Sequence, residues 1–177
     1  MSNIRIFVSH RIDIDSETVD TPVYFPVRCG AVYDEEGNSE IQGDDTGDNI
    51  SKLRMSFCEF TVQYWAWKNV DADYYGLCHY RRYLSFSDKH YKNTAFNMVR
   101  ELRLTAHEKK KYHLDDTKKI HSVVQKYDMI IPGLAKASEM SYNRAEVETL
   151  REMWESYNGV YFEQGIIDKM FSLIKEL

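Results

Sequence analysis

Residues 76–86 read GLCHYRRYLSF, and this stretch decides the fold because an apolar strand ends there in a group of basic side chains. Tyr74, Tyr75 and Leu77 form a β-friendly run with little polar alternation, which is typical of a strand buried on both faces. Residues 79–82, HYRR, then place one imidazole and two guanidiniums where the strand should end. The pattern therefore predicts a buried central strand with a charged carboxyl end.

Other apolar runs predict the partners of this strand. IRIFVS at residues 4–9 is short and β-branched and predicts a first strand, and YDMIIP at residues 127–132 predicts a later one. The segment VYFPVRCGAV between them predicts a second extended element, which Pro22 and Pro26 should make irregular or place at a sheet edge.

The clearest helix is predicted over residues 57–69. Ser56 and Glu59 have the spacing of a capping box, and Met55 and Phe60 stand at the matching hydrophobic staple positions. Apolar side chains recur on two sides of this helix, which favours a helix that is largely buried. These side chains are Phe57, Phe60, Tyr64 and Trp67 in one stripe, and Cys58, Val62 and Trp65 in the other.

The second half of the chain is expected to be more helical. Helices are predicted over about 94–111, after a cap at Asp115 or Asp116, over about 144–157 and over about 163–176. Strands that alternate with helices indicate an α/β fold with a mainly parallel sheet. We expect one domain over residues 1–177, with an α/β part at 1–132 and a helical tail at 138–177.

Composition excludes several classes of protein. The chain of 177 residues has a net charge of -5, which argues against a nucleic-acid partner. No run approaches the ~20 apolar residues of a membrane span, and no signal peptide is evident. Three scattered cysteines without a CxxC pair favour a reduced, cytoplasmic protein. Glycine-rich phosphate loops and histidine pairs with metal-ligand spacing do not occur.

Three polar clusters fall where predicted elements end. Residues 9–11 follow the first strand, residues 79–82 follow the central strand, and residues 43–51, GDDTGDNIS, precede the central helix. Because ligands of open α/β sheets bind beyond the carboxyl ends of the strands, we expect one crevice to collect all three clusters.

Each cluster also has an ordinary structural interpretation. Ser9 and His10 can be a simple strand exit, and GDDTGDNIS can be a solvated acidic turn, above all at Asp44. Arg81 and Arg82 can form an ion pair with the acidic loop at residues 34–48, and we expect one of the two to do so. We expect one of the two arginines to face the crevice and the other to pack outside it.

IRIFVSH, DDTGDNIS, FCEFTVQYWAWKN and DYYGLCHYRRY resemble, in order and spacing, the motifs of a bacterial glycosyltransferase family. That family occurs in capsular, exopolysaccharide and O-antigen gene clusters and was long catalogued as a domain of unknown function. The resemblance covers residues 4–86 and YDMIIP, and family members usually run longer, so part of the acceptor side is expected to be missing here. The resemblance implies a Rossmann-like A-type glycosyltransferase fold that binds a nucleotide sugar.

The resemblance also implies roles for individual residues. Most enzymes of this fold place an Asp-x-Asp metal motif at the end of the central strand, where this chain has residues 79–82. We therefore expect the arginines to replace a divalent metal, with no cofactor required, although Asp44 and Asp45 leave an atypical Mn²⁺ or Mg²⁺ site open. The residues expected to bind the nucleotide sugar are Ser9 and His10 at the nucleotide, Asp45, Thr46 and Asn49 at ribose or sugar hydroxyls, and His79, Arg81 and Arg82 at the diphosphate.

The expected function is transfer of a sugar, in the cytoplasm, from a UDP-sugar to a surface polysaccharide or lipid-linked glycan, with peripheral membrane association where the acceptor is lipid-linked. The alternative is a remnant module that keeps the fold and the nucleotide site without activity. No general base can be named from the sequence.

Overall fold

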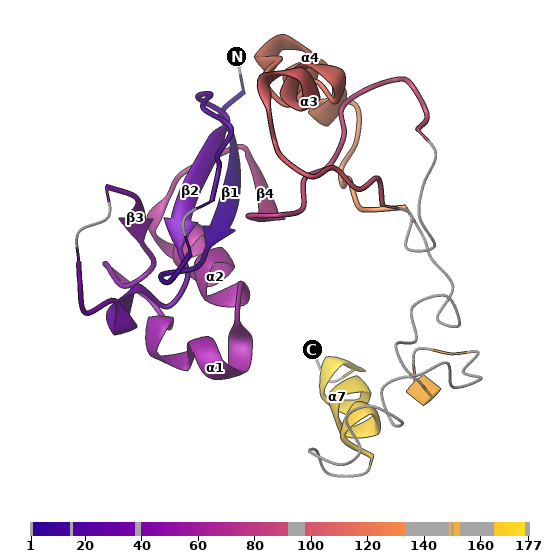
Figure 1. Cartoon of the computed structure of the whole chain (residues 1–177). Coiled ribbons are helices and arrows are strands. Elements are labelled where there is room, and N and C mark those ends of the chain that lie inside the picture. The colour runs from indigo at the N-terminus through magenta and orange to yellow at the C-terminus, as the bar shows by residue number, and fades with distance from the viewer. Residues whose placement is uncertain are drawn as a thin grey trace. The chain divides into compact units, whose positions relative to one another are not determined.

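A computed structural model describes residues 2–14, 16–37, 40–91, 98–133, 149, 151–152 and 165–175. The chain forms two compact units, one from Met1–His90 with Glu101–Ile130 and one from Tyr91–Arg100 with Ile131–Leu177. All the strands and the predicted site residues belong to the first unit (Figure 1).

The first unit is built on a parallel sheet with the strand order β3-β2-β1-β4 (Figure 1). Its strands are β1 Ile4–His10, β2 Tyr24–Arg28, β3 Gln42–Gly43 and β4 Tyr74–His79. The strands predicted at residues 4–9 and 74–80 are therefore confirmed, as is the α/β class of the fold. Residues 127–132 carry no strand, so that prediction is wrong, and the two-residue β3 was not expected.

Pro26 is tolerated in β2 even though this strand has neighbours on both sides. Cys29 N donates to His10 O and Ile6 N donates to Val23 O, so the odd-numbered residues of β2 bond to β1. Pro26 N therefore points to the β3 side, where pairing begins only opposite Val27. β2 is an internal strand, because it pairs with both β1 and β3. The N–H that Pro26 lacks would point to a position before β3 begins, so no sheet hydrogen bond is lost.

One face of the sheet is covered by α2, Phe60–Asn69. Its side chains Val62, Trp65 and Ala66 are buried against Phe7 and Val27 of the strands. The Phe7 and Trp65 rings pack edge to face at a centroid distance of 6.3 Å. This contact fixes α2 across the sheet, with its first turn near the carboxyl ends of the strands.

The helix predicted at residues 57–69 is broken at its start. A short α1, Arg54–Phe57, ends at Cys58, whose φ of 46° interrupts the helical path before α2 begins. Glu59 makes no capping hydrogen bond, so the predicted capping box does not form. The expectation of burial on two sides is also wrong, because Phe60 and Trp67 are 62% and 63% exposed.

Two short 3-10 helices, Ala31–Tyr33 and Ser51–Leu53, flank the acidic loop. Beyond β4, the first unit also contains α3 Ala106–Lys111 and α4 Thr117–Val124 (Figure 1). Residues 98–105 are not helical, so the helix predicted at 94–111 is confirmed only over its last turns.

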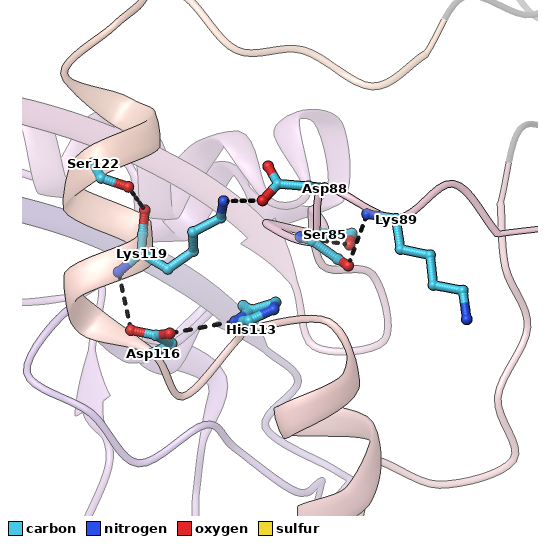
Figure 2. Close-up of polar contacts among 8 residues, drawn as sticks. Ser85, Asp88, Lys89, His113, Asp116, Lys119 and Ser122 are labelled. Atoms are coloured by element: carbon cyan, nitrogen blue, oxygen red, sulfur yellow. Dashed lines mark hydrogen bonds and ion pairs between the residues drawn. The ribbon is translucent and has the colours of Figure 1, made fainter.

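The predicted cap of α4 is confirmed at Asp116, whose carboxylate accepts a hydrogen bond from Lys119 N. Figure 2 shows that Asp116 also contacts His113, and that Lys119 reaches Asp88 in the segment after β4. Ile120 of α4 is fully buried. The segment after β4 is therefore tied to α4 by a polar contact.

In the second unit, α7 Ile166–Lys175 confirms the helix predicted at about 163–176. Most of the helix predicted at 144–157 lies outside the described residues, as does Gly159. Among the described helices, none has the length and apolar content needed to cross a membrane.

Candidate functional site

The carboxyl ends of β1 and β4 bring five of the eight predicted site residues together. Ser9 and His79 are register partners in this parallel pair. His10 is the last residue of β1, and Arg81 and Arg82 follow β4 directly. Parallel strands place their carboxyl ends at one edge, so residues that lie about seventy positions apart in sequence meet there.

The strand pleat divides this cluster between the two faces of the sheet. On the α2 face lies Ser9, and His79 Nε2 lies 3.4 Å from Glu59 Oε1 just before α2. On the opposite face, His10 Nδ1 lies 2.7 Å from Ser16 Oγ, and its ring lies 6.3 Å from that of Tyr80. Ser9 and His10 are both 2% exposed, so this edge has a buried floor.

A tight turn explains why β4 ends in two guanidiniums. Tyr80 N donates to Ser9 O at 3.0 Å, and Arg82 N donates to His79 O at 2.8 Å. Arg81 N donates to His79 Nδ1 at 3.2 Å. These bonds use the backbone of the turn and leave both arginine side chains exposed.

The arginines have no acidic partner in the part of the chain that the structure describes. The guanidinium carbon of Arg81 lies 4.9 Å from the centre of the Tyr80 ring. Among the described residues, neither Arg81 nor Arg82 takes part in an ion pair. The expected ion pair with the acidic loop is therefore wrong for the described residues. Two cations without a counterion at a strand edge form a site suited to an anion.

The two histidines of the edge both have a pKa below the ordinary value, which favours neutral rings at pH 7. Burial lowers the pKa of His10, and the neighbouring His79 lowers it further. The pKa of His79 is also lowered, first by burial and then by Arg82, Arg81 and Arg11, while Glu59 acts in the opposite direction. The positive charge of the edge at neutral pH therefore comes from arginine.

Asp44 has a structural place that the sequence did not predict. Its carboxylate is fully buried and accepts hydrogen bonds from Gly30 N and Ala31 N, both at 2.9 Å. The hydroxyls of Ser51 and Thr61 donate to it at 2.6 and 2.5 Å. The expectation of a solvated turn is wrong at Asp44, which instead ties the acidic loop to the first 3-10 helix and to α2.

The loop residues Asp45, Thr46 and Asn49 follow β3, and the hydrogen bonds of Thr46 and Asn49 lie within the loop and to α2 rather than to the ends of β1 and β4. Asn49 Nδ2 donates to the backbone oxygens of Asp45 and Gly47 within its own turn. Thr46 Oγ1 accepts a hydrogen bond from Trp65 Nε1 at 3.0 Å, which directs the loop along α2. The structure thus does not join these three residues to the strand-end cluster, and their role stays a prediction.

Glu59 is a residue of this edge that sequence reasoning placed elsewhere. Its Oε1 lies 3.4 Å from His79 Nε2, and 42% of its side chain is exposed. The capping-box pattern assigned Glu59 to the cap at the start of the helix, whereas its position directly before α2 offered another signal. A helix that leads into a parallel strand begins at the carboxyl edge of the sheet, where sites form.

Away from the strand ends, the described part of the chain has a cavity but no cluster of metal-ligating side chains. No group of three or more His, Cys, Asp and Glu side chains is arranged there to hold a metal ion. A separate cavity of about 260 Å³ runs along β4 and is mainly apolar, with Ile6, Tyr24, Phe86 and Met129 in its wall. None of the eight predicted site residues lines it.

Comparison with known proteins agrees with this architecture. The chain is similar to a solved structure described as "WbbM bifunctional glycosyltransferase apo structure", with a TM-score of 0.70 and 28% sequence identity. The match covers 90% of this chain and 29% of that one, so the chain spans less than a third of the longer protein. This likeness, with the parallel sheet and its helices, shows a Rossmann-like α/β fold of the glycosyltransferase type.

No curated protein matches the chain. The model of the family described as "Domain of unknown function (DUF4422)" matches residues 5–176, and the chain belongs to that family.

Proposed function

We propose that the chain is a glycosyltransferase that moves a sugar from a UDP-sugar to a bacterial surface polysaccharide or lipid-linked glycan. The observation that carries the proposal is the pair of exposed guanidiniums, Arg81 and Arg82, at the carboxyl edge of the sheet. They lack acidic partners among the described residues, in a fold shared with a glycosyltransferase. We place the reaction in the cytoplasm, with peripheral membrane association where the acceptor is lipid-linked.

The chemistry of sugar transfer fits such an edge. When the anomeric carbon leaves the nucleotide, negative charge develops on the diphosphate, and preorganised cations lower the energy of that charge. A guanidinium can make two parallel hydrogen bonds to phosphate oxygens. Arg81 and Arg82 are the groups we assign to this task, next to His79, with Ser9 and His10 forming the floor for the nucleotide.

A divalent metal is not required in this proposal. The alternative site at Asp44 and Asp45 has little to offer a cation, because the oxygens of Asp44 already accept four hydrogen bonds. The assignment of Asp45, Thr46 and Asn49 to ribose or sugar hydroxyls rests on the motif resemblance alone, since the loop bonds to itself and to α2.

The test is release of UDP from a panel of UDP-sugars by the whole chain in EDTA, because many transferases hydrolyse their donor slowly without acceptor. We expect at least one donor to be hydrolysed, and the variant carrying both Arg81→Ala and Arg82→Ala to be slower by about 100-fold. Arg103→Ala is the matched control, since Arg103 is an exposed arginine away from the edge.

The outcomes separate the candidate functions. If UDP binds but no UDP-sugar of the panel is hydrolysed, the inactive nucleotide-sugar-binding module is favoured. Absence of both binding and hydrolysis would contradict the proposal altogether.

A further inference from the structure

Among the described carboxylates near the ends of β1 and β4, Glu59 has an oxygen that no structural contact occupies. Asp13 gives both oxygens to Arg11, through Nε at 2.8 Å and through a short contact with NH2. Asp44 is fully buried, and both of its oxygens accept hydrogen bonds. Glu59 contacts His79 through Oε1, and in the part of the chain that the structure describes its Oε2 has no hydrogen-bond partner.

The hydrogen bond from Arg81 N determines which ring nitrogen of neutral His79 carries the hydrogen. A backbone N–H can only donate, so the bond from Arg81 N at 3.2 Å makes His79 Nδ1 an acceptor. The neutral ring must then carry its hydrogen on Nε2, which is the nitrogen that faces Glu59 Oε1 at 3.4 Å. The hydrogen of neutral His79 thus lies on the nitrogen nearer Glu59, at a distance longer than an ordinary hydrogen bond, and Nδ1 is already occupied by Arg81 N.

Other charged groups surround the pair formed by Glu59 and His79. Arg81 and Arg82 in the turn after β4, and Arg11 after the end of β1, lower the pKa of the His79 ring. His10 approaches it from the other face of the sheet and has a lowered pKa of its own. Glu59 is thus a half-exposed carboxylate next to a histidine on which three guanidiniums act.

We propose that Glu59 is the general base of the transfer reaction and that His79 is the positioning residue that holds it. This inference rests on the proposed glycosyltransferase function. The acceptor hydroxyl gives its proton to Glu59 Oε2, and the acceptor oxygen forms a bond to the anomeric carbon. The bond from that carbon to the diphosphate breaks, and its electron pair leaves on UDP beside Arg81 and Arg82. A single displacement of this kind inverts the anomeric configuration.

Glu59→Gln keeps the shape of the side chain and removes its basicity. Because Glu59 makes no capping bond to α2, the variant is expected to fold, which its denaturant unfolding curve checks. UDP affinity should stay within about 2-fold of wild type, while UDP release from a hydrolysed UDP-sugar should fall at least about 100-fold, since general-base catalysis contributes ~10²–10⁴. Glu36→Gln, in an exposed loop, should leave both quantities unchanged.

A second measurement does not depend on turnover. In ¹⁵N NMR spectra of the wild-type chain, His79 should show the tautomer with hydrogen on Nε2, and its pKa should fall further in Glu59→Gln, because the carboxylate raises it. A hydrogen on Nδ1, or a His79 pKa that Glu59→Gln leaves unchanged, would overturn the pairing.

A failure of the general-base inference can be told apart from a failure of the proposed glycosyltransferase function. Turnover within 10-fold of wild type in Glu59→Gln overturns the general base while the proposed function stands. If the wild-type chain hydrolyses no donor in the panel, the general base falls with the proposed function, and the NMR measurement then decides the pairing alone.

Discussion

At the scale of single residues, Asp44 shows how a carboxylate in a motif can be structural. Its two oxygens join three parts of the chain that lie apart in sequence: the residues after β2, the second 3-10 helix and the first turn of α2. A buried charge is stable only when such bonds replace its hydration. The same bonds fix the end of the acidic loop close to the strand edge without exposing Asp44.

Asp44→Asn should therefore reduce the free energy of unfolding by about 3 kcal/mol or more. Gly30 N and Ala31 N donate to different oxygens, so whichever way the amide turns, one backbone N–H faces its NH₂ group. Denaturant unfolding measures the loss. Asp45→Asn is the matched control, since Asp45 is exposed, and should change stability by less than about 0.5 kcal/mol. Equal stability of the two variants would show that the Asp44 network is unimportant.

At the scale of elements, α2 separates two tryptophans that the sequence pattern treated alike. Trp65 is 4% exposed and packs against Phe7, with its ring stacked near that of Phe25. Trp67 is 63% exposed, and Lys68 Nζ lies 3.8 Å from the centre of its ring. Only the face with Trp65 contributes to the core.

Trp65→Ala should cost about 3–5 kcal/mol in unfolding free energy, as loss of a core aromatic does. Trp67→Ala should cost less than about 1 kcal/mol, because its contacts are on the surface. Urea midpoints of the two variants make the comparison. A larger loss for Trp67→Ala would mean that the outer face of α2 is covered.

The same elements show how far sequence reasoning reaches. Apolar runs predicted β1 and β4 because both strands are buried, and the cap at Asp116 predicted the start of α4 because capping is local. The break at Cys58 could not be predicted, since a φ of 46° at that residue conflicts with the helical pattern around it. Residues 127–132 have strand composition, but composition does not decide whether a run pairs with β4.

At the scale of the whole molecule, strand order decides which parts of the site meet. The rule that ligands bind at carboxyl edges correctly brought Ser9 and His10 to His79 and the arginines, because β1 and β4 are parallel neighbours. It did not place residues 45–49, whose position follows from side-chain bonds to α2. Glu59 was missed as a site residue, because its contact with His79 is tertiary and the local capping pattern offered another explanation.

The central claim is that the arginines at the end of β4 bind the diphosphate of a nucleotide without a metal. Titration calorimetry of the whole chain with UDP in EDTA tests it most directly. We predict binding that weakens by about 1.5–3 kcal/mol in Arg81→Ala or Arg82→Ala, the range for hydrogen bonds to charged groups. Lysine at either position should restore only part of this loss, and Asp45→Asn should change little. Binding that requires Mn²⁺, is lost in Asp45→Asn and is unchanged in both arginine variants would contradict the claim.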